Sequence, residues 1–121
     1  MRLGAYACEI KEGSLAHKAY QTTLIYERHR HRYELNNEYL KDFESNGLIA
    51  SGINPDSNLV EVMELVDHPF FLGTQYHPEL KSTVEKPHPL FVAFVKACLE
   101  YHKGRTPKHV SEKSTTAAVR T

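Results

Sequence analysis

The chain has 121 residues, a formal net charge of zero, and 40% hydrophobic and 25% charged residues. This length fits one domain or part of one, and the composition excludes fibrous and disordered proteins. Zero net charge gives no support for binding to nucleic acid or to a membrane surface, and no apolar run approaches the roughly 20 residues that span a bilayer.

Two cysteines, Cys8 and Cys98, are too few for a disulfide framework. The first residues, MRLGAYACEIKEG, lack the basic segment and apolar core of a signal peptide. We therefore expect a reducing, cytoplasmic location.

The first third of the chain predicts two strands separated by a short helix. The apolar stretch 4–10 is bounded by glycine and predicts a strand, and residues 14–20 predict one or two helical turns with Ser14 as the N-cap. Residues 23–35 begin as a β-branched strand and then alternate strictly, so successive side chains point to opposite faces.

The middle of the chain predicts a helix and three strands. Residues 36–47 combine a capping asparagine, an apolar stripe and the terminator Gly47, which is typical of a helix. Strands are expected at 48–53 and 59–65, joined by a turn. The nearly continuous apolar run 70–77 indicates a strand buried on both faces of a sheet.

The last helix is predicted to begin at Pro89 and to end at Gly104 and Pro107. Residues 104–121 are rich in Ser, Thr and Lys and show no periodicity, so we expect a flexible basic tail. Residues 1–103 therefore form the folded part, and the order of elements predicts an α/β fold with a mixed sheet and flanking helices.

His77 and Glu79 are the first candidate site residues. Catalytic groups in open α/β sheets gather at the carboxyl ends of strands, which is where His77 is expected. A spacing of two on an extended chain places both side chains on one side, so Glu79 can orient the ring and leave one ring nitrogen as a base. An ordinary, partly exposed His–Glu pair is the alternative, because H-x-E is a short and common pattern.

Three arginines, Arg28, Arg30 and Arg32, share one face of the expected strand, with His29 and His31 on the other. Guanidinium groups so placed repel one another unless an anion lies opposite, and Arg suits bidentate capture of a carboxylate. A solvated edge strand whose charges discourage edge-to-edge pairing is the alternative.

Neither a metal site nor a nucleophile is evident. His29 and His31 lack an obvious third and fourth ligand for zinc. A nucleophile on an α/β scaffold sits in a strained strand-to-helix turn built from small residues, and no candidate has such neighbours: Cys8, Cys98, Ser14 and Ser51. Both cysteines are instead expected to be small buried apolar residues.

Six motifs, in order, resemble the C-terminal part of CTP synthases, which join a synthetase domain to a class I glutamine amidotransferase domain. They are MRLG at Met1, ERHRHRYELNN at Glu27, GLIASG at Gly47, LVEVMEL at Leu59, QYHPE at Gln75 and HPLFVAFVKA at His88. The resemblance covers residues 1 to about 102 and implies part of the flavodoxin-like amidotransferase fold.

The resemblance also implies roles for three residues. His77 is expected to be the general acid and base, Glu79 to orient it, and Arg32 to bind the α-carboxylate of glutamine. A cysteine thiolate attacks the side-chain amide in such enzymes, and the ammonia released passes to the synthetase domain to convert UTP to CTP.

The family's G-x-C-x-G elbow and its synthetase domain have no counterpart in this sequence. We therefore expect a C-terminal fragment that is inactive alone, with no cofactor or metal of its own and with ATP and Mg²⁺ bound by the missing domain. Its expected partners are glutamine and the remainder of the enzyme, which is expected to be a homo-oligomer. A fragment of another class I amidotransferase and a non-catalytic binding module derived from one are the alternatives.

Overall fold

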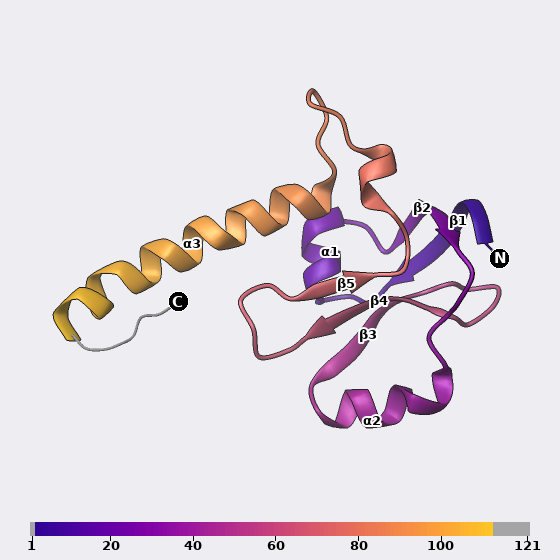
Figure 1. Ribbon diagram of the computed structural model, residues 1–121, viewed down its shortest axis with the longest axis horizontal. Coiled ribbons are helices and arrows are strands. Elements are labelled where there is room, and N and C mark those ends of the chain that lie inside the picture. The colour runs from indigo at the N-terminus through magenta and orange to yellow at the C-terminus, as the bar shows by residue number, and fades with distance from the viewer. Residues whose placement is uncertain (1, 113–121) are drawn as a thin grey trace.

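The structure is a computed structural model that describes residues 2–112, and the side chains of residues 2–104. Figure 1 shows its elements along the chain: β1 (Arg2–Ile10), α1 (Leu15–Tyr20), β2 (Leu24–His31), the 3-10 turn η1 (Asn37–Tyr39), α2 (Leu40–Ser45), β3 (Leu48–Ile53), β4 (Val60–Leu65), β5 (Leu72–Thr74), the 3-10 turn η2 (Pro78–Lys81) and α3 (Pro89–Glu112). Helices and strands are present as the α/β prediction requires.

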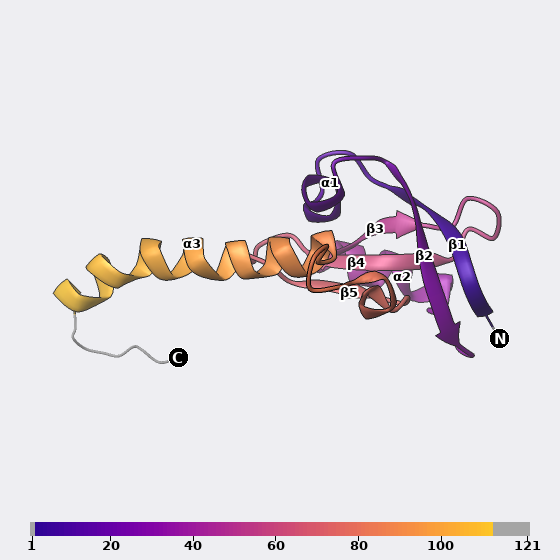
Figure 2. The same cartoon turned by 90° about the horizontal axis from the view of Figure 1, so that it is seen from above.

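The five strands form one sheet in the order β2-β1-β3-β4-β5, and every pairing is antiparallel. The prediction of a mixed sheet is therefore wrong, because each pair of neighbouring strands in this part of the chain runs in opposite directions. Viewed from above, β1 and β2 are steeply inclined to β4 and β5, so the sheet is strongly curled (Figure 2). Strand twist of one hand accumulates across a sheet in this way.

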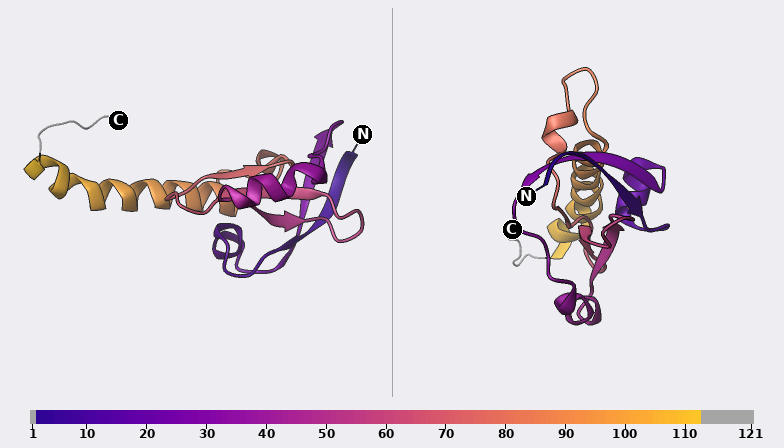
Figure 3. Two further views of the ribbon diagram at one scale, coloured as in Figure 1. Left: turned by 90° about the horizontal axis from the view of Figure 1, so that it is seen from below. Right: turned by 90° about the vertical axis from the view of Figure 1, so that its right-hand side faces the viewer.

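The core lies where α1 and the first turn of α3 pack on the sheet. Its buried members come from every part of the fold: Cys8, Ile10, Ala16, Ile25, Val62, Tyr76 and Leu90. Beyond that first turn, α3 projects away from the sheet as an arm (Figure 3). No helix within residues 2–112 has the length and apolar character needed to cross a membrane.

Local signals in the sequence are confirmed where they depend on neighbouring residues. The Ser14 side chain accepts a hydrogen bond from the N–H of His17 and caps α1. Asn36 caps the turn that leads into α2, and Gly47 follows that helix with a φ of 91°. Asn54 holds the turn between β3 and β4 by accepting from the backbone N–H groups of two following residues.

The apolar run at 70–77 is predicted to be a long buried strand, and this prediction is wrong. β5 covers Leu72–Thr74 only and is an edge strand that pairs with β4 alone. Phe71 is half-exposed, and Phe70 turns from the sheet to the Phe94 ring of α3, with 5.6 Å between ring centroids. The run is apolar because it meets a helix, not because a sheet covers both of its faces.

The predicted end of the last helix at Gly104 and Pro107 is also wrong, because α3 continues to Glu112. A proline inside a helix removes one backbone hydrogen bond, while those on either side of it still form. Cys98 is exposed on this helix, against the prediction that it is buried. Residues 113–121 lie outside the described residues, and the flexible tail stays a prediction.

Candidate functional site

The segment that carries His77 crosses from one edge of the sheet to the other. After β5, the N–H of Gln75 donates to the carbonyl of Glu61 on β4 at 2.8 Å. The Tyr76 side chain then enters the core, and the N–H of His77 donates to the carbonyl of Arg28 on β2 at 3.0 Å. The edge of β2 is therefore hydrogen-bonded to the His77 segment, so that η2 covers it.

His77 and Glu79 contact each other directly. His77 Nδ1 lies 2.9 Å from Glu79 Oε2, and the two side chains are 38% and 59% exposed. The hydrogen bond from His77 holds the pKa of the Glu79 carboxyl below its usual value. A carboxylate accepting from Nδ1–H leaves Nε2 as the basic nitrogen of the ring. The pair can therefore take up and return a proton at Nε2.

The backbone route to this contact differs from the one expected. His77 is extended, with φ −113° and ψ 91°, but Pro78 begins the 3-10 turn η2. The carboxylate therefore reaches the ring across a turn, not along one side of an extended strand. A proline at the start of such a turn has a suitable φ and needs no N–H donor there.

Below the His77 segment lies a buried polar network that sequence reasoning missed. Glu27 Oε2 accepts hydrogen bonds from His88 Nε2 at 2.6 Å and from the Tyr20 hydroxyl at 2.7 Å. The Tyr20 hydroxyl lies 3.0 Å from that of Tyr76, and His88 Nδ1 accepts from the N–H of Leu90 at the start of α3. Burial raises the pKa of Tyr20 and of Tyr76, so both remain protonated donors.

This network joins β2, α1, α3 and the residue next to His77. One signal could have found it: strict alternation along β2 puts Glu27 on the same face as His29, which is the buried face. A carboxylate at an inward position requires partners from other elements.

The predicted arginine face of β2 is confirmed for Arg28 and Arg30, whereas Arg32 lies beyond the end of the strand. Arg28 and Arg30 are exposed, whereas Glu27 and His29 are buried. Arg30 contributes to the low pKa of Glu79, so its charge lies near the His77–Glu79 pair. The carbonyl of Arg28 at the edge of β2 is bonded to the N–H of His77, and the edge-protection interpretation of the arginines stays a prediction.

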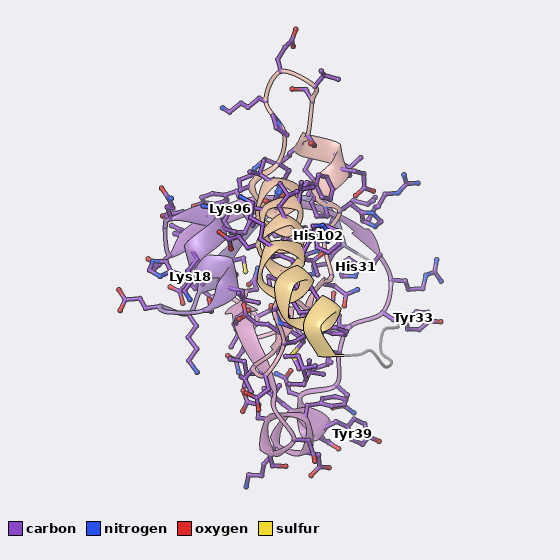
Figure 4. All side chains as sticks on the ribbon, turned by 90° about the vertical axis from the view of Figure 1, so that its left-hand side faces the viewer. Lys18, His31, Tyr33, Tyr39, Lys96 and His102 are labelled. Atoms are coloured by element: carbon purple, nitrogen blue, oxygen red, sulfur yellow. The ribbon has the colours of Figure 1, made fainter. Side chains whose placement is uncertain are left out.

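Arg32 lies one residue beyond β2, in a bend, and is exposed. Its guanidinium makes no hydrogen bond or ion pair with any residue of the described part of the chain. The next residue, Tyr33, points outward (Figure 4). The structure therefore places Arg32 at the surface with its donors available, at the end of the strand that also binds the backbone of His77.

Neither cysteine lies in a strand-to-helix turn, since Cys8 is within β1 and Cys98 is within α3. Cys8 is fully buried, and burial raises the pKa of its thiol. Cys98 lies on the exposed surface of α3. Among the side chains of residues 2–104, no group of three or more His, Cys, Asp or Glu is arranged to hold a metal ion.

An apolar hollow of about 530 Å³ has Pro78 and Glu79 in its lining. β5 and the first turns of α3 line it, largely with Phe70, Phe71 and Phe94. Such a lining offers little to a small zwitterion, so the hollow is not the place where the polar groups converge.

Comparisons with known proteins agree on one family. The pattern of the family "Glutamine amidotransferase class-I" matches residues 1–97. A CTP synthase of Cytophaga hutchinsonii is 63% identical over 105 residues, which is 87% of this chain and 20% of that protein. A CTP synthase of Aquifex aeolicus is 62% identical over 103 residues, which is 85% of this chain and 19% of that protein.

A solved structure is also similar. It is the glutaminase domain of a Trypanosoma brucei CTPS with bound acivicin, with a TM-score of 0.77 and 37% identity. The similarity covers 83% of this chain and 40% of that one. This chain thus spans about a fifth of the length of the curated relatives it matches.

Proposed function

Because the chain belongs to the class-I glutamine amidotransferases, we propose that it supplies the histidine–glutamate part of the glutaminase site of a CTP synthase. The observation that carries this proposal is the 2.9 Å contact between His77 Nδ1 and Glu79 Oε2 on a partly exposed segment. The similarity to CTP synthases, at about 60% identity over most of the chain, supports the choice of enzyme.

The proposed reaction is the hydrolysis of glutamine. A cysteine thiolate on a segment outside this chain attacks the side-chain amide carbon, and His77 gives a proton to the departing ammonia. The glutamyl thioester that remains is attacked by water, from which His77 removes a proton, so that glutamate is released and the thiolate restored. Glu79 accepts from Nδ1–H throughout and keeps Nε2 as the nitrogen that exchanges protons.

Arg32 is proposed to bind the α-carboxylate of glutamine. Two parallel N–H···O bonds from a guanidinium fix the orientation of a carboxylate better than a single point charge does. The exposed position of Arg32 and its lack of a partner among the described residues support this role. Arg28 and Arg30 have no assigned part in the reaction.

The remaining chemistry is proposed to belong to other parts of the enzyme. Ammonia would aminate UTP in the synthetase domain, with ATP supplying activation and Mg²⁺ bound there. The free thiols of Cys8 and Cys98 support a reducing cytoplasm as the location. We also propose that the intact enzyme is a homo-oligomer and that this chain alone does not hydrolyse glutamine, because Cys8 is buried and neither cysteine lies in a strand-to-helix turn.

A chimera tests the proposal. In the Aquifex aeolicus CTP synthase, the matching segment of 103 residues is replaced by this chain. The chimera should form CTP from glutamine, and His77→Ala should abolish that activity. The same variant should retain CTP formation from added ammonia, because the synthetase chemistry does not need His77.

The matched control is His68→Ala, which changes an exposed histidine in the turn between β4 and β5. It should leave both activities unchanged. Glutamine-dependent activity that survives His77→Ala would overturn the proposal, as would ammonia release by the chain alone. A folded chimera that uses ammonia but never glutamine would favour the non-catalytic binding module.

A further inference from the structure

Arg2, the first residue of β1, makes a three-pronged contact at the end of the sheet. Its Nε and Nη2 lie 2.8 and 3.1 Å from the two carboxylate oxygens of Glu34, and its Nη1 lies 2.6 Å from Glu61 Oε2. The Arg2 side chain is 12% exposed, and that of Glu61 is fully buried on β4. One guanidinium therefore ties the segment after β2 to β4.

A second set of contacts holds the residue before Glu34. The carbonyl of Tyr33 accepts from His31 Nδ1 at 3.1 Å and from Gln75 Nε2 at 3.3 Å. Because His31 uses Nδ1–H as a donor, its Nε2 accepts from His29 Nδ1–H at 2.7 Å. The buried ring of His29 thus fixes the ring of His31, which fixes the backbone at Tyr33.

The two sets meet at Glu61. His29 Nε2 and Glu61 Oε1 are 3.5 Å apart, and neither of these buried atoms has a hydrogen-bond partner in the described part of the chain. Burial raises the pKa of Glu61, while burial and then the Arg2 charge lower the pKa of His29 to about 4. The buried carboxyl of Glu61 thus lies beside the buried ring of His29, and this contact links the two sets.

Arg32 directly precedes the two residues that are held in this way. Its own side chain has no partner among the side chains of residues 2–104, while the backbone at Tyr33 and the carboxylate of Glu34 are fixed to three strands and to the segment after β5. A ligand-binding side chain is effective when the groups around it fix its backbone in advance. The backbone next to Arg32 is fixed in advance by its neighbours in this way.

We propose that Arg2 is a positioning residue for glutamine binding, which acts on Arg32 through Glu34 and through the buried Glu61–His29–His31 chain. The inference rests on the proposed function, because Arg32 must be the group that binds the α-carboxylate. Arg2 itself touches no substrate in this account.

The test is a double-mutant cycle in the chimera described above, with KM for glutamine as the readout. Arg32→Lys and Arg2→Lys should each raise KM, Arg2→Lys by about tenfold, with kcat changed less than about twofold. The double variant should have the same KM as Arg32→Lys alone. A lysine ammonium at position 32 does not depend on the orientation that a guanidinium needs to bind both oxygens of a carboxylate. CTP formation from ammonia should remain unchanged in all three.

Three outcomes separate the possibilities. If Arg32→Lys leaves KM unchanged, the role of Arg32 in the proposed function fails, and the inference fails with it. If Arg32→Lys raises KM but Arg2→Lys does not, only the positioning role is overturned. If the two effects multiply in the double variant, Arg2 acts on stability or elsewhere, which also overturns it.

A milder variant keeps the test informative if Arg2→Lys does not fold. Gln75→Ala removes one of the two hydrogen bonds to the Tyr33 carbonyl and leaves the buried charges intact. It should raise KM by about threefold in the presence of Arg32 and have no effect in the Arg32→Lys background. An equal effect in both backgrounds would overturn the inference.

Discussion

The carbonyl of Arg28 accepts a hydrogen bond from the N–H of His77 at 3.0 Å, which joins two residues far apart in the sequence. β2 thereby sets the position of the His77 backbone, and Arg32 follows the end of the same strand. The same strand, β2, therefore positions both the proposed acid–base group and the proposed carboxylate-binding group. Glu27 and His29, on the buried face of that strand, fix it to the core.

Glu79→Gln should lower glutamine-dependent CTP formation by the chimera about a hundredfold or more. A carboxylate can only accept from Nδ1–H, whereas a neutral amide can also donate to the ring, so the imidazole is no longer held in one tautomer and orientation. The measurement is kcat with glutamine, compared with kcat for added ammonia. A loss of less than twofold with glutamine would show that Glu79 does not orient His77.

Gly52→Ala should destabilise the fold by about 1–3 kcal/mol, because it overpacks the core. A Cβ at Gly52 would lie 2.6 Å from Val62 Cγ2 and 2.8 Å from Cys8 Sγ. Gly73→Ala is the matched control, since a Cβ there meets nothing within 4 Å. Urea denaturation of the two variants and the parent measures the difference, and equal stabilities of both variants would contradict the packing described here.

Glu27→Ala should destabilise the fold by about 3 kcal/mol and loosen the start of α3. The change leaves His88 Nε2–H and the Tyr20 hydroxyl without their shared acceptor in a buried place. Glu9→Ala, at an exposed position of β1, is the control and should cost less than about 0.5 kcal/mol. Hydrogen exchange at the N–H of Leu90, which bonds to His88 Nδ1, reports the loosening directly.

Stability should fall as the pH is lowered from about 6.5 to about 4, through His29. The ring is buried, which lowers its pKa to about 4 in the folded chain, so in this range the unfolded chain binds a proton that the folded chain does not. The neutral His29 ring contributes at most about 3 kcal/mol to the free energy of unfolding. This contribution is fully present above pH 6.5 and is lost as the pH falls toward 4.

The variant His29→Gln isolates this contribution. The raised pKa of Glu61 acts in the opposite direction, since it favours the folded chain at low pH. The difference between parent and variant in free energy of unfolding, measured at pH 7 and at pH 4.5, should shrink by about 2 kcal/mol at the lower value. A difference that is the same at both pH values would contradict a neutral, buried His29.

The chain alone should self-associate through α3, because large apolar side chains on this helix are exposed. Val95 and Leu99 are more than half exposed, beyond the turn that packs on the sheet. Val95→Lys with Leu99→Lys should shift the chain toward monomer without loss of helix content. Light scattering over a range of concentrations measures the shift, and a monomeric parent at high concentration would contradict the expectation.

Much of the local structure could be predicted from the sequence, because it depends on residues that are neighbours in the chain. Ser14, Asn36 and Gly47 cap or end their helices as predicted, and the alternation along β2 correctly separates arginines from the buried face. The His77–Glu79 pair could also be anticipated, since two residues suffice to bring the groups together, although their roles stay predictions.

The tertiary structure alone decided how these elements pair and what surrounds the site. Phe70 packs on α3 instead of extending β5, which remains a short edge strand. The antiparallel sheet arises from pairing between strands that are separated in the sequence. Two sets of contacts join residues from separate elements. They are the hydrogen bond between Glu27 and His88 and the hydrogen bonds from Arg2 to Glu34 and Glu61. Periodicity and capping residues predict the local backbone conformation, because they depend on neighbouring residues. The partner of a buried charge comes from whichever element folding brings near it, so the sequence pattern does not predict it.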